Sequence, residues 1–178
     1  MTDTPAANIQ APDIQTTDAE RKRARHLHAV LLFNLVVNHI FLFLMALTLI
    51  KLSSIPMVLM AVTSISLLAY ILISAKRSLT GESSWFIRCH WQLAAKRARM
   101  FLILFLVLGT LSLAIFYGGH AIGIKGVASI AFASILGLIF MVAVLGLVVV
   151  EFDAEHQSKA GKIPAGAIAD YPQTKESA

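Results

Sequence analysis

Four stretches of the chain are long and apolar enough to cross a lipid bilayer, at about residues 29–50, 56–75, 100–118 and 127–150. An α-helix rises about 1.5 Å per residue, so the ~30 Å core of a bilayer takes about 20 residues. The sequence is 57% hydrophobic and only 14% charged, and a water-soluble domain of this size has too small a core to bury that excess. We therefore predict an all-α polytopic membrane protein whose four transmembrane helices form two antiparallel hairpins.

The polar segments divide the chain around these spans. We expect residues 1–25 to be a disordered polar tail with a basic end, because they hold too few apolar side chains to form a core. Residues 26–152 are predicted to form the transmembrane domain, with a basic loop at residues 76–99, and residues 153–178 a second disordered tail. The first tail does not read as a signal peptide, because the apolar run starts late and no small-residue cleavage site ends it.

The distribution of positive charge predicts the orientation. Of the 15 Lys and Arg residues, all but Lys51 and Lys125 lie in the two tails or in the central interval. Basic residues are enriched on the cytoplasmic side of membrane proteins, so both termini and residues 76–99 are expected in the cytoplasm. The same pattern explains the net charge of +5 by anionic headgroups of an inner (plasma) membrane rather than by nucleic acid.

The first span carries three polar residues at membrane depth, Asn34, Asn38 and His39. Asn34 and Asn38 are four residues apart and share a face, whereas His39 points about 100° away from Asn38. A polar residue at this depth either lines a functional path or holds neighbouring helices together. Both interpretations stay open, and the structural one is favoured because neutral histidine is cheap in a membrane compared with Lys or Asp.

The second span offers hydroxyl groups that can complete a polar seam with the first. Thr63, Ser66 and Tyr70 follow a helical spacing on one face. Ser and Thr hydroxyls also bond back to carbonyls of their own helix, so a shared seam and isolated hydroxyls are both compatible with the pattern.

The fourth span has a different signal, a stripe of small residues. Ser129, Ala133 and Gly137 recur every four residues, which lets another helix backbone approach closely. In addition, the tetrapeptide at residues 22–25 recurs at 96–99. This repeat reflects either a duplicated hairpin or, as we favour, the recruitment of basic residues to the same side of two spans.

The interval before the third span contains the richest local motif. Its members are Trp85, Arg88, Cys89, His90, Trp91 and Gln92. Trp85, Phe86, Cys89 and Leu93 recur at a near-helical spacing, which suits a short helix lying among lipid headgroups. The alternative is a loop whose tryptophans belong to the aromatic belt at the membrane surface.

The segment from Trp85 to Gln92 resembles a pattern in small uncharacterised bacterial four-helix inner-membrane proteins. Those proteins carry a His followed by Trp-Gln and basic residues before the third span, although with a different spacing. The resemblance covers a short part of the chain, and it implies a bacterial inner-membrane location without any defined activity.

No catalytic motif accompanies these features. One cysteine cannot form an intramolecular disulfide or a Cys-based zinc site, and Cys89 and His90 are neighbours that point about 100° apart on a helix. The spans hold no carboxylate, and nucleotide-binding, hydrolase and metalloprotease signatures are missing. We therefore expect no enzyme activity, cofactor or metal.

Three functions follow for testing, in order of preference. The first is an accessory, assembly or scaffold subunit that packs in the membrane against itself or against other subunits. The second is a small homo-oligomeric transporter or channel with His39 and Asn38 in the path. The third is a membrane enzyme that uses Cys89 and His90 at the cytoplasmic surface.

Overall fold

The computed structural model describes residues 15–49, 53, 55–121, 123 and 126–172, and every regular element in them is helical. Helix α1 (Asp18–Phe33) continues through a π-helix, η1 (Asn34–Phe41), into α2 (Leu42–Leu49). Three long helices follow, α3 (Ile55–Gly81), α4 (Trp85–Ala121) and α5 (Gly126–Lys159), and then the short α6 (Ala165–Asp170). The predicted helical class is confirmed. Four helices of the described chain are long and apolar enough to cross a membrane.

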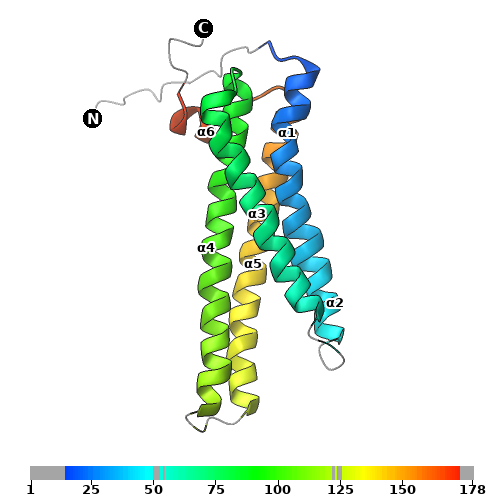
Figure 1. Ribbon diagram of the computed structural model, residues 1–178, viewed down its shortest axis with the longest axis vertical. Coiled ribbons are helices and arrows are strands. Elements are labelled where there is room, and N and C mark those ends of the chain that lie inside the picture. The colour runs from blue at the N-terminus through cyan, green and yellow to red at the C-terminus, as the bar shows by residue number, and fades with distance from the viewer. Residues whose placement is uncertain (1–14, 50–52, 54, 122, 124–125, 173–178) are drawn as a thin grey trace, which may run out of the picture.

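The helices converge at one end of the bundle. In Figure 1, α1 and α4 begin, and α3 and α5 end, at the top of the view, where α6 also lies. We call this the basic end, formed by residues 15–28, 75–99 and 150–172. At the opposite end, the pair α4 and α5 extends beyond α2 and diverges from it (Figure 1).

The predicted disorder of residues 1–25 is wrong for its last part, because α1 already begins at Asp18. Thr17 caps this helix: its hydroxyl accepts from the Glu20 N–H, and the Glu20 carboxylate accepts from the Thr17 N–H at 2.9 Å. This capping box satisfies backbone donors that the first turn of a helix leaves unpaired. Residues 1–14 lie outside the described part.

The predicted basic loop at residues 76–99 is also corrected. Helix α3 runs to Gly81 and α4 begins at Trp85, so the connection is only residues 82–84. The motif residues form neither a separate interfacial helix nor a loop but the first turns of α4. Their apolar stripe, Phe86, Cys89 and Leu93, is buried inside the protein, where it packs with Ala154 and Ile163 rather than among headgroups.

The predicted disorder of residues 153–178 fails as well. Helix α5 continues to Lys159, and the chain then turns back so that α6 packs on α4. Gly161 makes this turn with φ of +70°, and an added Cβ would lie 2.6 Å from the Thr16 hydroxyl. Glycine is required there, because other residues disfavour this backbone conformation and would also clash. Residues 173–178 lie outside the described part.

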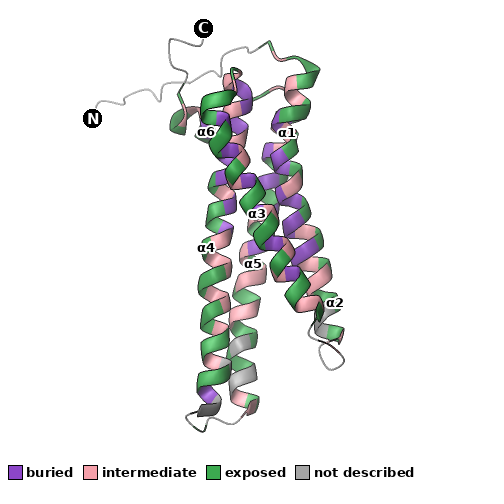
Figure 2. Cartoon of the chain, viewed as in Figure 1, coloured by how far each residue is buried: buried purple, intermediate pink, exposed green. Residues whose placement is uncertain are grey.

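Burial is unequal between the spans. Buried residues gather at the basic end and along α1, whereas the far parts of α4 and α5 are mostly exposed or half-buried (Figure 2). In the most apolar stretch of each helix, 44% of residues are buried in the first span, against 6% in α4 and 11% in α5. The second pair of helices therefore presents most of its apolar side chains to its surroundings.

Candidate functional site

A buried ionic network joins three helices at the basic end. It consists of His28 from α1, His90 and Arg97 from α4, and Glu151 from α5. Glu151 lies in the final turns of α5, after the apolar run of that helix has ended. His28 Nδ1 lies 2.5 Å from one Glu151 oxygen, and Arg97 Nη1 donates to the other at 2.7 Å. His28 Nε2 lies 3.0 Å from His90 Nδ1. We call these four residues the ionic network.

The direction of the hydrogen bonds fixes where protons reside in this network. His90 Nε2 lies 3.0 Å from the Lys162 carbonyl, which can only accept, so this nitrogen carries the proton. In a neutral His90 ring, Nδ1 then accepts, and His28 Nε2 must donate to it. His28 Nδ1 lies against one Glu151 oxygen, and the other Glu151 oxygen accepts from Arg97. The network therefore gathers the Arg97 guanidinium and two imidazole rings around a single carboxylate.

Burial at this end controls two titratable groups in the polar part of α4 that precedes its apolar run. Desolvation by burial and, to a smaller extent, the neighbouring His28 together lower the pKa of His90 to about 3, so His90 is neutral. Burial raises the pKa of the Cys89 thiol to about 12, which keeps it in the thiol form. The Cys89 Sγ donates to the Tyr171 carbonyl at 3.6 Å, so Cys89 and His90 bond to separate partners.

The other motif residues also bond within the protein. The Trp85 ring N–H donates to the Tyr171 carbonyl, and the Trp91 ring N–H to the Arg23 carbonyl, both at 2.9 Å. Gln92 is buried and donates to the Ala75 carbonyl of α3 at 2.6 Å. Arg88 is half-buried. The tryptophans expected at the membrane surface therefore fasten α1 and the C-terminal segment to α4.

A second, uncharged cluster lies deeper in the first span. The Asn34 amide donates to the Ser64 hydroxyl at 3.2 Å, and the Asn38 amide donates to Asn34 Oδ1 at 3.1 Å and to the Met60 carbonyl at 2.9 Å. All these groups are buried. We call Asn34, Asn38, His39 and Ser64 the polar seam. The contacts of its two asparagines join η1 to α3.

The His39 ring lies against α4 and α5 rather than against α3. Its Nδ1 bonds to the Asn34 carbonyl five residues earlier at 3.0 Å, a spacing that the π-helix provides. Its ring packs edge-on against Phe101, Phe105 and Phe140 from α4 and α5. Of the described side chains, only His39 Nε2 and Asn38 Oδ1 are buried without a hydrogen-bond partner.

The remaining predicted residues lie elsewhere. The seam uses Ser64 instead of the neighbouring Thr63, while Ser66 bonds to the Val62 carbonyl of its own helix. The exposed Tyr70 hydroxyl lies 2.9 Å from His26 Nε2 near the basic end. In the small-residue stripe, the side chains of Ser129 and Ala133 are outside the description, and a Cβ added at Gly137 would meet nothing within 4 Å.

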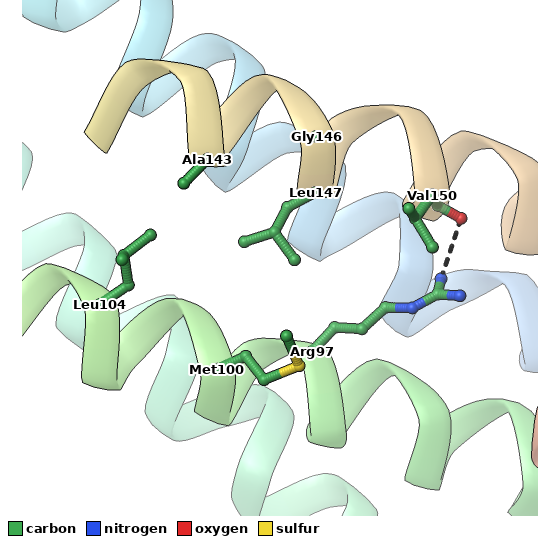
Figure 3. Close-up of a pocket in the computed structure, with 7 residues that line it drawn as sticks. All are labelled: Arg97, Met100, Leu104, Ala143, Gly146, Leu147 and Val150. Carbon is green, nitrogen blue, oxygen red and sulfur yellow. Dashed lines mark hydrogen bonds between the residues drawn. The ribbon is translucent and has the colours of Figure 1, made fainter. Parts of the chain in front are cut away.

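An apolar groove of about 430 Å³ lies between α4 and α5 and ends at the basic end (Figure 3). Met100, Leu104, Ala143, Gly146, Leu147 and Val150 line it together with Arg97. Figure 3 shows the Arg97 side chain extended along the head of the groove, where its Nη1 donates to the Val150 carbonyl at 3.1 Å. We call this cavity the α4–α5 groove.

Comparisons with known proteins supply no further constraint: no protein-family model, curated protein or solved structure matches this chain. In the part of the chain that the structure describes, His, Cys, Asp and Glu side chains form no cluster of three or more that could hold a metal ion.

The sequence singled out Asn34, Asn38 and His39 but not Ser64, and it did not indicate the ionic network. His28 and Glu151 flank apolar runs 123 positions apart, and each alone is an ordinary charged or polar end of a span. The available signal was that Glu151 directly follows the fourth apolar run, close to the level of Arg97 before the third. A carboxylate so near a membrane core needs a buried cationic partner.

Proposed function

We propose that the protein is a non-catalytic accessory, assembly or scaffold subunit of a membrane complex. The low burial of α4 and α5 carries this proposal, because their apolar side chains are left for lipid or for helices of other subunits. In contrast, the hydrogen bonds of Asn34, Asn38 and Ser64 stay within the bundle, as expected for groups that hold helices together.

The proposal includes an orientation. The basic end, with its clusters of Lys and Arg, is placed in the cytoplasm of a bacterial cell, against the anionic inner-membrane surface. A reporter fused after Ala178 is expected to be active only inside the cell. Activity of the same fusion outside the membrane would contradict this orientation.

Site-specific photocrosslinking tests the subunit function. A photoreactive residue at Leu138 of α5 samples the uncovered pair of helices, and the same residue at Ile65 of α3, also exposed, is the matched control. We expect Leu138 to crosslink to a defined protein, either another subunit or a second copy, and Ile65 to react mainly with lipid. Native mass spectrometry of a mild-detergent extract that shows only a stable monomer, with no protein adduct at either position, would refute the proposal.

A small transporter or channel is the second candidate, favoured by one observation. His39 Nε2 and Asn38 Oδ1 are buried at membrane depth without partners among the described residues, as in a path that passes water or a proton. We expect the His39→Ala variant to change flux in proteoliposomes if this candidate is correct. Unchanged flux would remove His39 from the path, and a parent protein without flux would remove the candidate.

A further inference from the structure

We propose that the α4–α5 groove binds one acyl chain of an anionic phospholipid, whose phosphate is held by Arg97. This site would exist whether the protein acts as a subunit or as a transporter, because it depends only on the chain lying in a membrane. The inference combines the shape of the groove, the position of its cationic end, and the single carboxylate of the ionic network.

The shape of the groove fits a hydrocarbon chain. Its volume of about 430 Å³ lies within the range of small-molecule sites, roughly 300–1,000 Å³. Along α4 it reaches from Arg97 to Leu104, which is about 10 Å of helix rise, or roughly two thirds of the ~15 Å half-thickness of a bilayer core. A Cβ added at Gly146 would meet nothing within 4 Å, so glycine here leaves space that no described residue fills.

The position of Arg97 fits a lipid headgroup. Arg97 and Val150 lie at the boundary between the apolar runs and the polar basic end, the level at which lipid phosphates sit. Toward the described residues, the guanidinium donates from Nη1 alone, to Glu151 and to the Val150 carbonyl, so its Nε and Nη2 have N–H groups to donate. Arginine is well suited to phosphate, because its planar donors match the oxygen geometry.

The composition of the ionic network favours an anion at this point. The network supplies a single carboxylate, that of Glu151, which Arg97 shares with the His28 ring. An adjacent phosphate would accept from the guanidinium donors that Glu151 does not use. A zwitterionic lipid offers the same phosphate together with a cation, so the preference is for anionic headgroups.

Lipid retention measured by native mass spectrometry tests the site. The full-length protein is equilibrated in mild detergent with phosphatidylglycerol or phosphatidylcholine carrying identical acyl chains. We expect the parent protein to retain phosphatidylglycerol about fivefold more strongly, the factor that corresponds to ~1 kcal/mol for one basic side chain.

Two glycine variants separate the groove from the remaining lipid-facing surface. Gly146→Leu places a side chain in the groove, and Gly109→Leu is the matched control, because a Cβ there also meets nothing within 4 Å. We expect Gly146→Leu to lose the preferential retention and Gly109→Leu to keep it, both with the parent's circular dichroism. If Gly146→Leu does not fold, Ala143→Leu fills the same groove.

Three results would overturn the proposal. Equal retention of the two lipids would remove the phosphate contact, and unchanged retention in the folded groove-filling variant would remove the groove. A groove-filling variant that only converts an oligomer into a monomer, in a protein retaining no lipid, would assign the groove to a second copy of the chain.

Discussion

The basic end and the middle of the bundle bury polar side chains in opposite ways. The ionic network sets the Arg97 guanidinium against one oxygen of the Glu151 carboxylate and the His28 ring against the other. The polar seam, deeper in the first span, contains no Lys, Arg, Asp or Glu: its asparagine amides bond to one another, to Ser64 and to a backbone carbonyl. Both regions are buried, so exposure does not explain the difference.

Distance from water explains it instead. Glu151 and Arg97 lie where the apolar runs end, so the chain can bury them with only part of the cost of moving a charge into hydrocarbon. Asn34 and Asn38 lie inside an apolar run, where a neutral amide is affordable and a carboxylate is not. The comparison predicts that breaking the ionic network lowers the unfolding free energy far more than breaking the polar seam does.

Removing Glu151 should have the largest effect. In Glu151→Leu, Arg97 and His28 lose their shared partner, and we expect a loss of about 3–5 kcal/mol of unfolding free energy, typical of a broken buried ion pair. Denaturant unfolding in detergent measures it. Asp153→Leu, at an exposed carboxylate on the same helix, is the control and should change stability little. Equal losses in the two variants would show that the network carries no special energy.

Placing a charge in the polar seam should have the second largest effect on stability. Asn38→Asp keeps the size of the side chain but puts a carboxylate at membrane depth, with an expected cost of about 2.5–3.5 kcal/mol if it stays ionised. Membrane insertion and unfolding assays measure this cost. A fully stable Asn38→Asp protein would mean that water reaches the seam, which would favour the transporter function.

Removing the seam amide without adding a charge should cost less. In Asn38→Leu, two side-chain hydrogen bonds are lost, and hydrogen bonds between membrane helices are worth about 0.6 kcal/mol on average and at most ~1.7. Thr63→Val on α3, at a hydroxyl outside the seam, is the control. A loss as large as that of Glu151→Leu would contradict the distinction between the two regions.

The exposed ion pair at the basic end should have the smallest effect. Lys96 Nζ lies 2.6 Å from an Asp170 oxygen, and both side chains are largely exposed. We expect Lys96→Ala to leave the unfolding transition unchanged within error, because solvent screens such pairs. A loss of unfolding free energy comparable to that of Glu151→Leu would mean that ion pairs at this end are strong whether they are buried or exposed.

Much of the polar seam was predictable, because Asn34 and Asn38 are four residues apart and helix geometry alone brings them together. Its partner was less so: Thr63, Ser66 and Tyr70 share a face by spacing, but the packing of η1 on α3 turned Ser64 toward Asn34 instead. The π-helix was not predicted, since nothing in the apolar run from Asn34 to Phe41 signals a change of helical repeat.

The predicted polar tails and loop failed for a common reason. Their low hydrophobicity indicates that they cannot form a core alone, and that reasoning overlooks a core supplied by the rest of the chain. Ile163 and Ala167 are buried in one cluster with Phe86 and Leu93 of α4. A few apolar residues in the polar C-terminal segment are therefore sufficient to dock it on α4.

By itself, the sequence determined the helical class, the four apolar helices and the separation of charge from apolar runs, because each depends on the length and composition of continuous segments. Only the tertiary structure decided that His28, His90, Arg97 and Glu151 meet, that the C-terminal segment docks on α4, and that a groove opens beside Arg97. These features depend on the rotation and spacing of helices far apart in the chain, which the packing of all side chains sets together and no local pattern encodes.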